Sequence, residues 1–202
     1  MMADIAHGAN PALNFNLPYD TEKAFEPVVL VAEFPAVLAV DKGLPVKSAK
    51  EFVELAKAKP GQLNYSSSGI GSLNFLASEQ LKKETGADIV HIPYQSGAQA
   101  MTALISGNVQ MLITTVPPIL SSVERVKLLA VSGEKRLSTL PDVPTFTESG
   151  LPGFKMDLWQ GLLAPVGTDQ RIIQRLNQEL NAVLRSPDIR ERLTTLGGNV
   201  VG

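Results

Sequence analysis

The chain has 202 residues, of which 44% are hydrophobic and 19% are charged, and this is typical of a globular protein with one large or two small domains. Its net charge of −2 gives no reason to expect nucleic acid or an anionic membrane as a partner. Because the chain has no cysteine, disulfides, thiol chemistry and zinc sites with thiolate ligands are excluded.

The N-terminal part is predicted to lead from a loop into two short strands. Met1–His7 has no basic segment followed by an apolar one, so no signal peptide is expected, and no apolar run in the chain approaches the roughly 20 residues of a membrane span. Residues 8–27 contain several Xaa-Pro steps that disfavour helix, which predicts a loop. The β-branched and small apolar runs Val28–Ala32 and Ala36–Val40 predict two buried strands.

Helices and strands then alternate. Ser48 and Glu51 form a capping box, which predicts a helix that ends at Pro60-Gly61. Further strands are predicted around Leu63 and Tyr65 and at Ile89–Ile92, Val109–Ile113 and Lys127–Val131, with helical stretches between them. This alternation predicts a parallel sheet with right-handed crossovers.

The segment Asn64–Phe75 runs from a strand through a Ser/Gly turn into a helix. Such a turn directs free backbone N–H groups and the positive end of the helix dipole at one point, which suits a carboxylate or a phosphate. The glycines fit neither a P-loop nor the dinucleotide fingerprint, because no Lys follows Gly71 and Asn74 stands where the third glycine is needed. The structural alternative is a tight turn with Ser72 as the helix N-cap.

Two further polar turns, Tyr94–Gly97 and Thr114–Val116, follow the next two predicted strands. Because ligands of open α/β sheets bind beyond the carboxyl ends of the strands, all three turns are expected to share one rim. They offer backbone N–H groups, hydroxyls, the Gln95 amide and the Tyr94 phenol, which can hold an anion but include no strong acid or base. The residues therefore predict a binding protein for a small anion, and we favour a carboxylate.

The candidates for catalysis are few. His91 lies mid-strand in an apolar run, where a hydrogen-bonded core histidine is expected more often than a catalytic base. Asp157 is the other candidate base, with a structural role favoured, and the nearby Trp159 serves either as a stacking wall for a ligand or as core. No nucleophile elbow or metal-ligand spacing is present, so no metal or cofactor is expected.

The C-terminal part is predicted to add a further strand and two helices. Thr145 and Glu148 form a second capping box, and Asp157–Ala164 is predicted to be a strand. An apolar stripe then predicts a helix with Thr168 as its N-cap, and Ser186-Pro187 is predicted to begin the last helix.

Several motifs stand in an order that resembles a known family. They are Lys59–Ser72, His91–Gly97, Leu140–Thr145, Gly150–Phe154 and Trp159–Pro165. Together, over essentially the whole chain, they resemble the Bug-type extracytoplasmic solute receptors of tripartite tricarboxylate transporters. The resemblance implies an α/β, type II periplasmic-binding-protein fold, in which two lobes with a mostly parallel sheet and helices on both faces close on a carboxylate.

The resemblance also implies lobes, location and partners. The first lobe is expected at residues 1–42 and 156–202, and the second, with the Ser/Gly turn, at 43–155. We expect a periplasmic, non-enzymatic protein without a cofactor that delivers its ligand to membrane transporter subunits. One alternative is a sensory component that delivers its ligand to a signalling receptor. A less favoured alternative is an enzyme that acts on a carboxylate. The family's usual first strand and Pro-x-Gly-Gly turn are missing, so an incomplete first lobe is expected. Its open edges would favour a homodimer, strand exchange or aggregation.

Candidate ligand-binding residues lie in the three turns and at one aromatic side chain. By resemblance, the Ser67–Ser72 turn clamps a carboxylate mainly through main-chain N–H groups and hydroxyls. Family members often carry an acidic residue followed by Asn near Thr114 and Thr115, so this chain is not expected to recognise an amino group. The candidates are Ser67, Ser68, Gly69, Ile70, Gly71, Ser72, Asn74, Tyr94, Gln95, Gly97, Thr114, Thr115 and Trp159.

Overall fold

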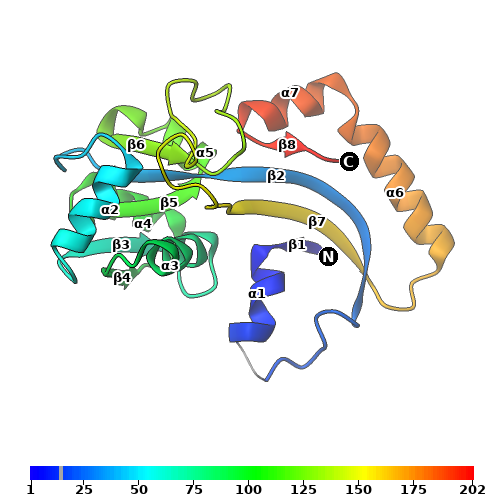
Figure 1. Ribbon diagram of the computed structural model, residues 1–202. Helices are drawn as coiled ribbons and strands as arrows, with labels where there is room; N and C mark the ends of the chain where they lie inside the picture. The colour runs from blue at the N-terminus through cyan, green and yellow to red at the C-terminus, as the bar shows by residue number, and fades with distance from the viewer. Residues whose placement is uncertain (14–15) are drawn as a thin grey trace. The chain divides into compact units, whose positions relative to one another are not determined.

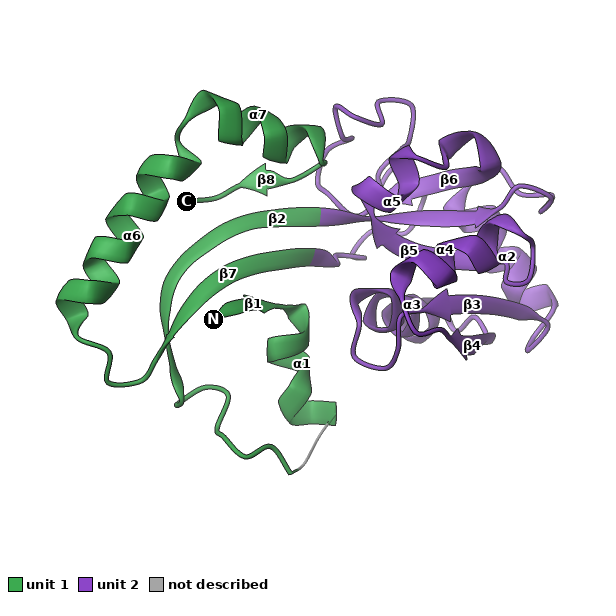
Figure 2. Cartoon of the chain, turned by 180° about the vertical axis from the view of Figure 1, so that it is seen from behind, with its two compact units in different colours: residues 1–34, 158–202 green, residues 35–157 purple. Residues whose placement is uncertain are grey.

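The structure is a computed structural model that describes residues 1–13 and 16–202. It divides into two compact units, coloured separately in Figure 2: unit 1 comprises Met1–Phe34 and Leu158–Gly202, and unit 2 comprises Pro35–Asp157. The lobe boundaries implied by the resemblance stay a prediction. In the part of the chain that is described, no helix is both long enough and apolar enough to cross a membrane.

Unit 2 is built on a sheet whose strands do not all run the same way. The strands β3 (Leu63–Ser67), β4 (Ile89–Pro93) and β5 (Met111–Thr115) are parallel, as predicted. The strand β2 (Phe25–Asp41) pairs antiparallel with both β5 and β6 (Val126–Val131). The prediction of parallel pairing is therefore wrong for β2, because this strand begins in unit 1 and the later alternation of helices and strands does not fix its direction.

Helices cover both faces of this sheet. They are α2 (Ala49–Ala58), α3 (Leu73–Thr85), α4 (Gly97–Ile105) and the short α5 (Val116–Leu120), the last followed by a 3-10 turn, Val123–Arg125. Side chains of a strand point alternately to its two faces, so β2 shows the layers directly. Ala36, Leu38 and Val40 lie in a core cluster with α2 and α3, whereas Val37 and Ala39 lie in a second cluster with α4 and α5.

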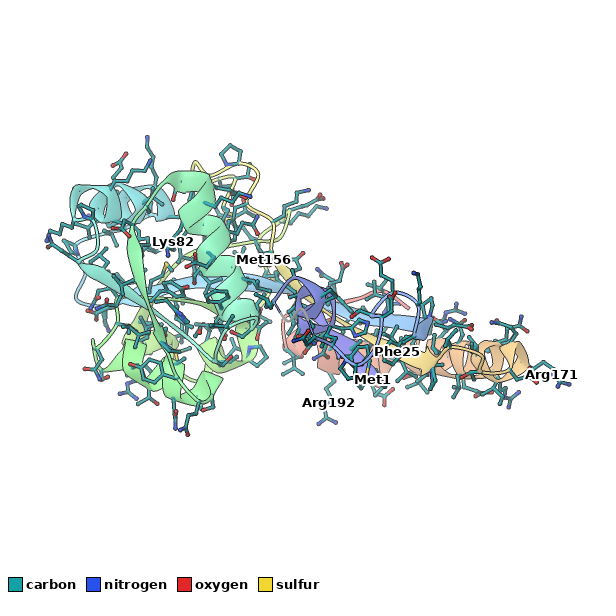
Figure 3. All side chains as sticks on the ribbon, turned by 90° about the horizontal axis from the view of Figure 1, so that it is seen from below. Met1, Phe25, Lys82, Met156, Arg171 and Arg192 are labelled. Atoms are coloured by element: carbon teal, nitrogen blue, oxygen red, sulfur yellow. The ribbon has the colours of Figure 1, made fainter. Side chains whose placement is uncertain are left out.

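Unit 1 has a smaller core. The strand β7 (Asp157–Pro165) pairs with β2 and, antiparallel, with β1 (Met2–Asp4), while β8 (Asn199–Val200) pairs antiparallel with β2 (Figure 1). Three helices complete the unit: α1 (Ile5–Leu13), α6 (Gln170–Leu184) and α7 (Pro187–Thr195). The buried residues of its core are Val28, Val29, Ala164, Ile173 and Leu184. The side chains of Arg171 in α6 and Arg192 in α7 are exposed (Figure 3).

Three local predictions are corrected. Of the predicted loop at residues 8–27, residues 8–13 belong to α1 and Phe25–Pro27 belong to β2, while residues 14–15 lie outside the described part of the chain. The start of α1 is capped by the Asp4 carboxylate, which accepts from Ala6 N at 2.9 Å. The two predicted strands between residues 28 and 40 are one strand, because Pro35 lies where the partner of β2 changes from β8 to β5 and its missing N–H interrupts neither ladder. Asp169, not Thr168, caps α6, since its side chain accepts from Arg171 N at 2.9 Å.

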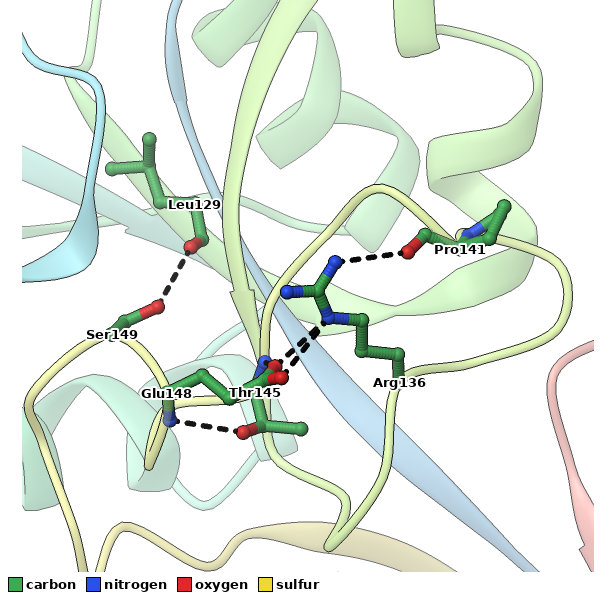
Figure 4. A network of polar contacts seen from close by, with 6 residues as sticks. All are labelled: Leu129, Arg136, Pro141, Thr145, Glu148 and Ser149. Carbon is green, nitrogen blue, oxygen red and sulfur yellow. Dashed lines mark hydrogen bonds and ion pairs between the residues drawn. The ribbon is translucent and has the colours of Figure 1, made fainter.

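The second predicted capping box is confirmed, although it closes a turn instead of opening a helix. The first forms only in part, because Glu51 Oε2 accepts from Lys47 N at 2.8 Å and not from Ser48 N. Ser48 Oγ accepts from Glu51 N at 3.1 Å and begins α2. Thr145 N donates to Glu148 Oε2 at 2.7 Å, and Glu148 N donates back to Thr145 Oγ1 at 3.1 Å (Figure 4). Arg136 Nε lies 3.0 Å from Glu148 Oε2, and Arg136 Nη1 donates to Pro141 O. Glu148 thus holds the loop after β6 from two directions.

Candidate functional site

The carboxyl ends of β3, β4 and β5 bring the three polar turns of unit 2 to one edge of the sheet. Tyr94 N donates to Ser67 O at 2.9 Å, which joins the first two turns. Asn74 Nδ2 donates to Ile113 O at 2.6 Å, which joins the first turn of α3 to the strand end that precedes Thr114. The structure therefore places the candidate residues of the turns within one connected edge.

The Ser67–Ser72 turn has a backbone that only glycine adopts easily. Gly69 and Gly71 have φ angles of 113° and 85°, in the region that side chains with a Cβ atom disfavour. Ser72 is the N-cap of α3, as predicted: its Oγ accepts from Phe75 N at 3.3 Å and donates to Gly69 O at 2.7 Å. Ile70, at the tip of the turn, is 70% exposed.

This backbone leaves hydrogen-bond donors free at the start of α3. Within residues 1–13 and 16–202, the N–H groups of Ile70, Gly71 and Leu73 have no hydrogen-bond acceptor. Successive backbone N–H groups around glycines of positive φ form a concave anion site, and the 13-residue helix α3 adds the positive end of its dipole. The turn can therefore hold a carboxylate without any charged side chain.

Three polar side chains near the turn are engaged inside the unit. Ser67 is fully buried, and its Oγ accepts from Gly69 N at 3.0 Å. Ser68 Oγ donates to Asn74 Oδ1 at 3.1 Å, and Asn74, which is 7% exposed, uses its amide nitrogen on Ile113 O. These side chains hold the turn in shape, so the donors of the turn that have no partner are mainly those of the backbone.

The other two turns differ from each other in their donors: within the described residues, the N–H groups of Ser96 and Gly97 in the second turn also have no hydrogen-bond acceptor. Gln95 and Gly97 are exposed, Gln95 N donates to Gln99 Oε1 at 3.2 Å, and Gly97 is the first residue of α4. Tyr94 is half-buried and packs against the core cluster on the α4 face of the sheet. Thr114 is buried, whereas Thr115 is half-buried at the start of α5 and makes no side-chain cap hydrogen bond.

Trp159 and Asp157 both lie in β7. Trp159 is half-buried in unit 1, where its ring lies beside Gly161: a Cβ atom on that glycine would be 3.5 Å from Trp159 Cζ3. Because the three turns belong to unit 2, a shared site with Trp159 stays a prediction. In unit 2, Asp157 Oδ1 accepts from Ser132 Oγ at 2.6 Å, and Ser132 Oγ accepts from Ala36 N at 2.7 Å. Asp157 thus has a structural contact.

His91 lies near this edge, and the sequence predicted that it forms a hydrogen bond but not which residues surround it. The prediction of a hydrogen-bonded histidine is confirmed, and the partner is the Ser67 hydroxyl, with Nε2 and Oγ 2.6 Å apart. The imidazole stacks on Tyr65, with ring centroids 4.9 Å apart, and contacts Phe75 at 5.0 Å. Burial lowers the pKa of His91, Lys82 acts in the same direction, and Glu79 opposes both.

Beside His91 lies a charged cluster on α3. Tyr65 Oη donates to Glu79 Oε1 at 2.7 Å, and Lys82 Nζ contacts the same oxygen at 2.7 Å. Burial and the hydrogen bond to Glu79 raise the pKa of Tyr65, so its phenol stays protonated. No cluster of three His, Asp or Glu side chains that could bind a metal ion occurs in the described part of the chain.

Comparison with known proteins decides the family. Residues 1–202 match the family described as the tripartite tricarboxylate transporter family receptor. The chain belongs to this receptor family. The resemblance found in the sequence motifs is thereby confirmed. The chain spans about half the length of the curated relatives it matches: a UPF0065 protein of Pseudomonas sp. (strain P51) is 35% identical over 189 residues, which cover 92% of this chain and 56% of that protein.

Solved structures confirm the predicted fold of this member of the receptor family. MatC from Rhodopseudomonas palustris, solved with bound malate, is 33% identical with a TM-score of 0.87, and the match covers 98% of this chain and 69% of MatC. Rpa4515 from R. palustris, solved with adipate, is 33% identical with a TM-score of 0.84, over 93% of this chain and 63% of that protein. The fold is therefore of the α/β periplasmic-binding-protein type.

Proposed function

We propose that this chain binds a small carboxylate as an extracytoplasmic solute-binding receptor and delivers it to a tripartite tricarboxylate-type membrane transporter. The observation that carries the proposal is the Ser67–Ser72 turn, which has N–H groups without an acceptor at and just before the start of α3. Membership of the receptor family supports it, as do two relatives of similar structure that were solved with malate and with adipate.

In this proposal, one carboxylate group of the ligand accepts hydrogen bonds from the N–H groups of Ile70, Gly71 and Leu73. Gly71 has no Cβ atom, so no side chain of its own separates a ligand from its backbone N–H. The turn itself contains no Lys or Arg, and recognition therefore uses neutral donors and the helix dipole. Neutral donors discriminate weakly among acids, which is compatible with different acids in related receptors.

The family resemblance adds the remaining parts of the proposal. On this ground the proposal includes closure of the two predicted lobes on the ligand, a periplasmic location and a contribution of Trp159. It also includes the absence of catalysis and of a cofactor. The engaged side chains of Asp157 and His91 favour binding over catalysis, because both candidate bases already have a structural partner. The comparisons give no support to a homodimer.

The test is a calorimetric titration of the purified chain with malate, succinate, adipate, citrate and glutamate. The corresponding diamide of adipate serves as a control because it keeps the length and loses both charges. A ligand at a hundredfold excess over its dissociation constant stabilises the protein by about 2.7 kcal/mol, which a parallel thermal-shift measurement detects. Binding of at least one acid without binding of the diamide is expected. Equal binding of acid and diamide, or of none of the acids, would overturn the proposal.

A further inference from the structure

We propose that His91 is a positioning residue for the anion-binding turn: it fixes the Ser67 hydroxyl, and through this hydroxyl it fixes the Gly69 N–H. This inference rests on the proposed function, because it explains how the same turn keeps the shape that offers its N–H groups to a carboxylate. His91 itself contacts no ligand in this arrangement. Its effect on binding passes through Ser67.

The fold places His91 beside Ser67 for a simple geometric reason. Tyr65 and His91 are direct partners in the parallel ladder of β3 and β4. Tyr65 and Ser67 are two residues apart, so they point to the same face of the sheet. The imidazole can therefore stack on Tyr65 and reach the hydroxyl of Ser67 at the same time, with Nε2 2.6 Å from Oγ.

The helix α3, which covers this face of the sheet, supplies the remaining contacts around the imidazole. Phe75, Glu79 and Lys82 are spaced four and three residues apart and so share one side of α3. Phe75 contacts the imidazole at a centroid distance of 5.0 Å. Glu79 binds both Tyr65 and Lys82, which keeps the neighbouring charges paired. The rings of Tyr65 and Phe75 thus fix the orientation of His91.

The distances assign the protons. Ser67 Oγ accepts from Gly69 N at 3.0 Å, so its own proton needs an acceptor elsewhere. Two acceptors lie within reach of this proton, Gly69 O at 3.4 Å and His91 Nε2 at 2.6 Å. In this proposal the hydroxyl donates to the nearer one, His91 Nε2. His91 is therefore neutral, with its proton on Nδ1.

The burial of the Ser67 hydroxyl explains why loss of His91 would change the turn. Ser67 is fully buried, and a buried hydroxyl without an acceptor is costly. Without His91, the Ser67 proton would turn toward Gly69, and the hydroxyl oxygen would no longer be oriented to accept the Gly69 N–H. The positive φ of Gly69 would then lose the contact that favours it, and the N–H groups of Ile70 and Gly71 would no longer be held in one direction.

Two variants separate the hydrogen bond from the ring packing. His91→Phe keeps an aromatic ring between Tyr65 and Phe75 but has no acceptor for Ser67. His91→Gln loses the ring but keeps an acceptor oxygen at a similar distance along the side chain. If His91 acts through its acceptor, Gln rescues the turn and Phe does not.

The first measurement is NMR without ligand, so it does not depend on the proposed function. In the wild type, His91 Nε2 is expected to resonate as an unprotonated nitrogen, and the Gly69 amide is expected to be protected from hydrogen exchange. His91→Phe is expected to lower that protection by about 2- to 10-fold, while the amide of Tyr94, which donates to Ser67 O, is unaffected. A protonated Nε2, or unchanged Gly69 protection in His91→Phe, would overturn the inference.

The second measurement is calorimetric titration with malate. His91→Phe is expected to weaken binding by about 2- to 10-fold, and adding Ser67→Ala to it should cause no greater loss than Ser67→Ala alone. Additive losses would overturn the inference, because His91 would then act independently of Ser67. If the wild type binds neither malate nor any other acid, the proposed function fails, and the ligand-free NMR result alone decides the positioning role.

Discussion

Asn74 Nδ2 donates a hydrogen bond to Ile113 O over 2.6 Å, and Asn74 Oδ1 accepts from Ser68 at 3.1 Å. A single buried amide thus connects the anion-binding turn, the start of α3 and the end of β5. Both functional halves of this amide are used, one as donor and one as acceptor. Asn74, which the sequence proposed as a ligand-binding residue, is therefore engaged as a support of the site.

Asn74→Asp should destabilise the protein by about 1–3 kcal/mol at pH 7, because a carboxylate cannot donate to Ile113 O and is buried beside it. Burial raises the folded pKa of such a carboxyl above its unfolded value, so the loss should shrink as the pH falls toward 4 and the protonated form can donate again. Urea unfolding at several pH values measures this. Asn108→Asp, at an exposed position, should change little. A loss independent of pH would argue against the assigned donor.

Gly71→Val should abolish carboxylate binding and cost about 1–2 kcal/mol of stability, since a β-branched residue is strained at a φ of 85° and would block the backbone. Gly153→Val is a matched control: its φ is 105°, it is exposed, and a Cβ atom there would meet nothing within 4 Å. The control shares the backbone strain of a positive φ, so it should lose stability and keep its affinity. Calorimetry and thermal unfolding of both variants distinguish strain from loss of the site, and retained affinity in Gly71→Val would remove the turn from it.

Glu148→Ala should loosen the loop after β6 more than Arg136→Met does. Glu148 accepts from Thr145 N and from Arg136, whereas Arg136→Met removes only the ion pair and its contact with Pro141 O (Figure 4). The hydrogen bond from Arg136 also lowers the pKa of Glu148, so the pair should weaken as the pH falls below the carboxyl's ordinary value of 4.5. Hydrogen exchange of the Thr145 amide measures the effect. Equal exchange in both variants would contradict the double role of Glu148.

Protonation of His91 should destabilise the folded protein. Its folded pKa lies below the ordinary value of 6.5, mainly because of burial, so the unfolded chain binds more protons between the two values. The stability that His91 contributes is present above pH 6.5 and is lost as the pH falls toward the folded pKa. The difference in unfolding free energy between wild type and His91→Phe should therefore decrease from pH 7.5 to pH 5.5 in urea unfolding. A difference that stays constant over this range would contradict the assigned neutral state.

Local signals in the sequence were sufficient for several parts of the fold. Ser48 and Ser72 cap helices where predicted, and Pro187 begins α7 at its first position. Each of these features depends on hydrogen bonds or backbone angles within a few residues, so the local sequence carries the information. The Asp169 cap was missed because its neighbour Thr168 is an equally good cap by residue type, and only the backbone geometry decides between them.

Contacts between distant residues could not be read from the sequence. The pairing of Ser67 with His91 depends on the register of β3 and β4, and a shift by one residue would turn His91 to the other face of the sheet. The direction of β2 likewise depends on its partners β5 and β6, which follow it by many residues. The sequence contains both residues of each pair but no local signal that joins them.

The sequence by itself determined the glycine-rich turn, its helix cap and the family, because these are encoded by short motifs in a fixed order. Only the tertiary structure decided which groups of the turn are free. The side chains of Ser67, Ser68 and Asn74 were equal candidates with the backbone until packing of β3, β5 and α3 engaged them inside the unit. What is left for a ligand is the set of N–H groups of Ile70, Gly71 and Leu73. Leu73 begins α3, where the first N–H groups of a helix have no intrahelical acceptor, and Ile70 and Gly71 lie in the turn before it.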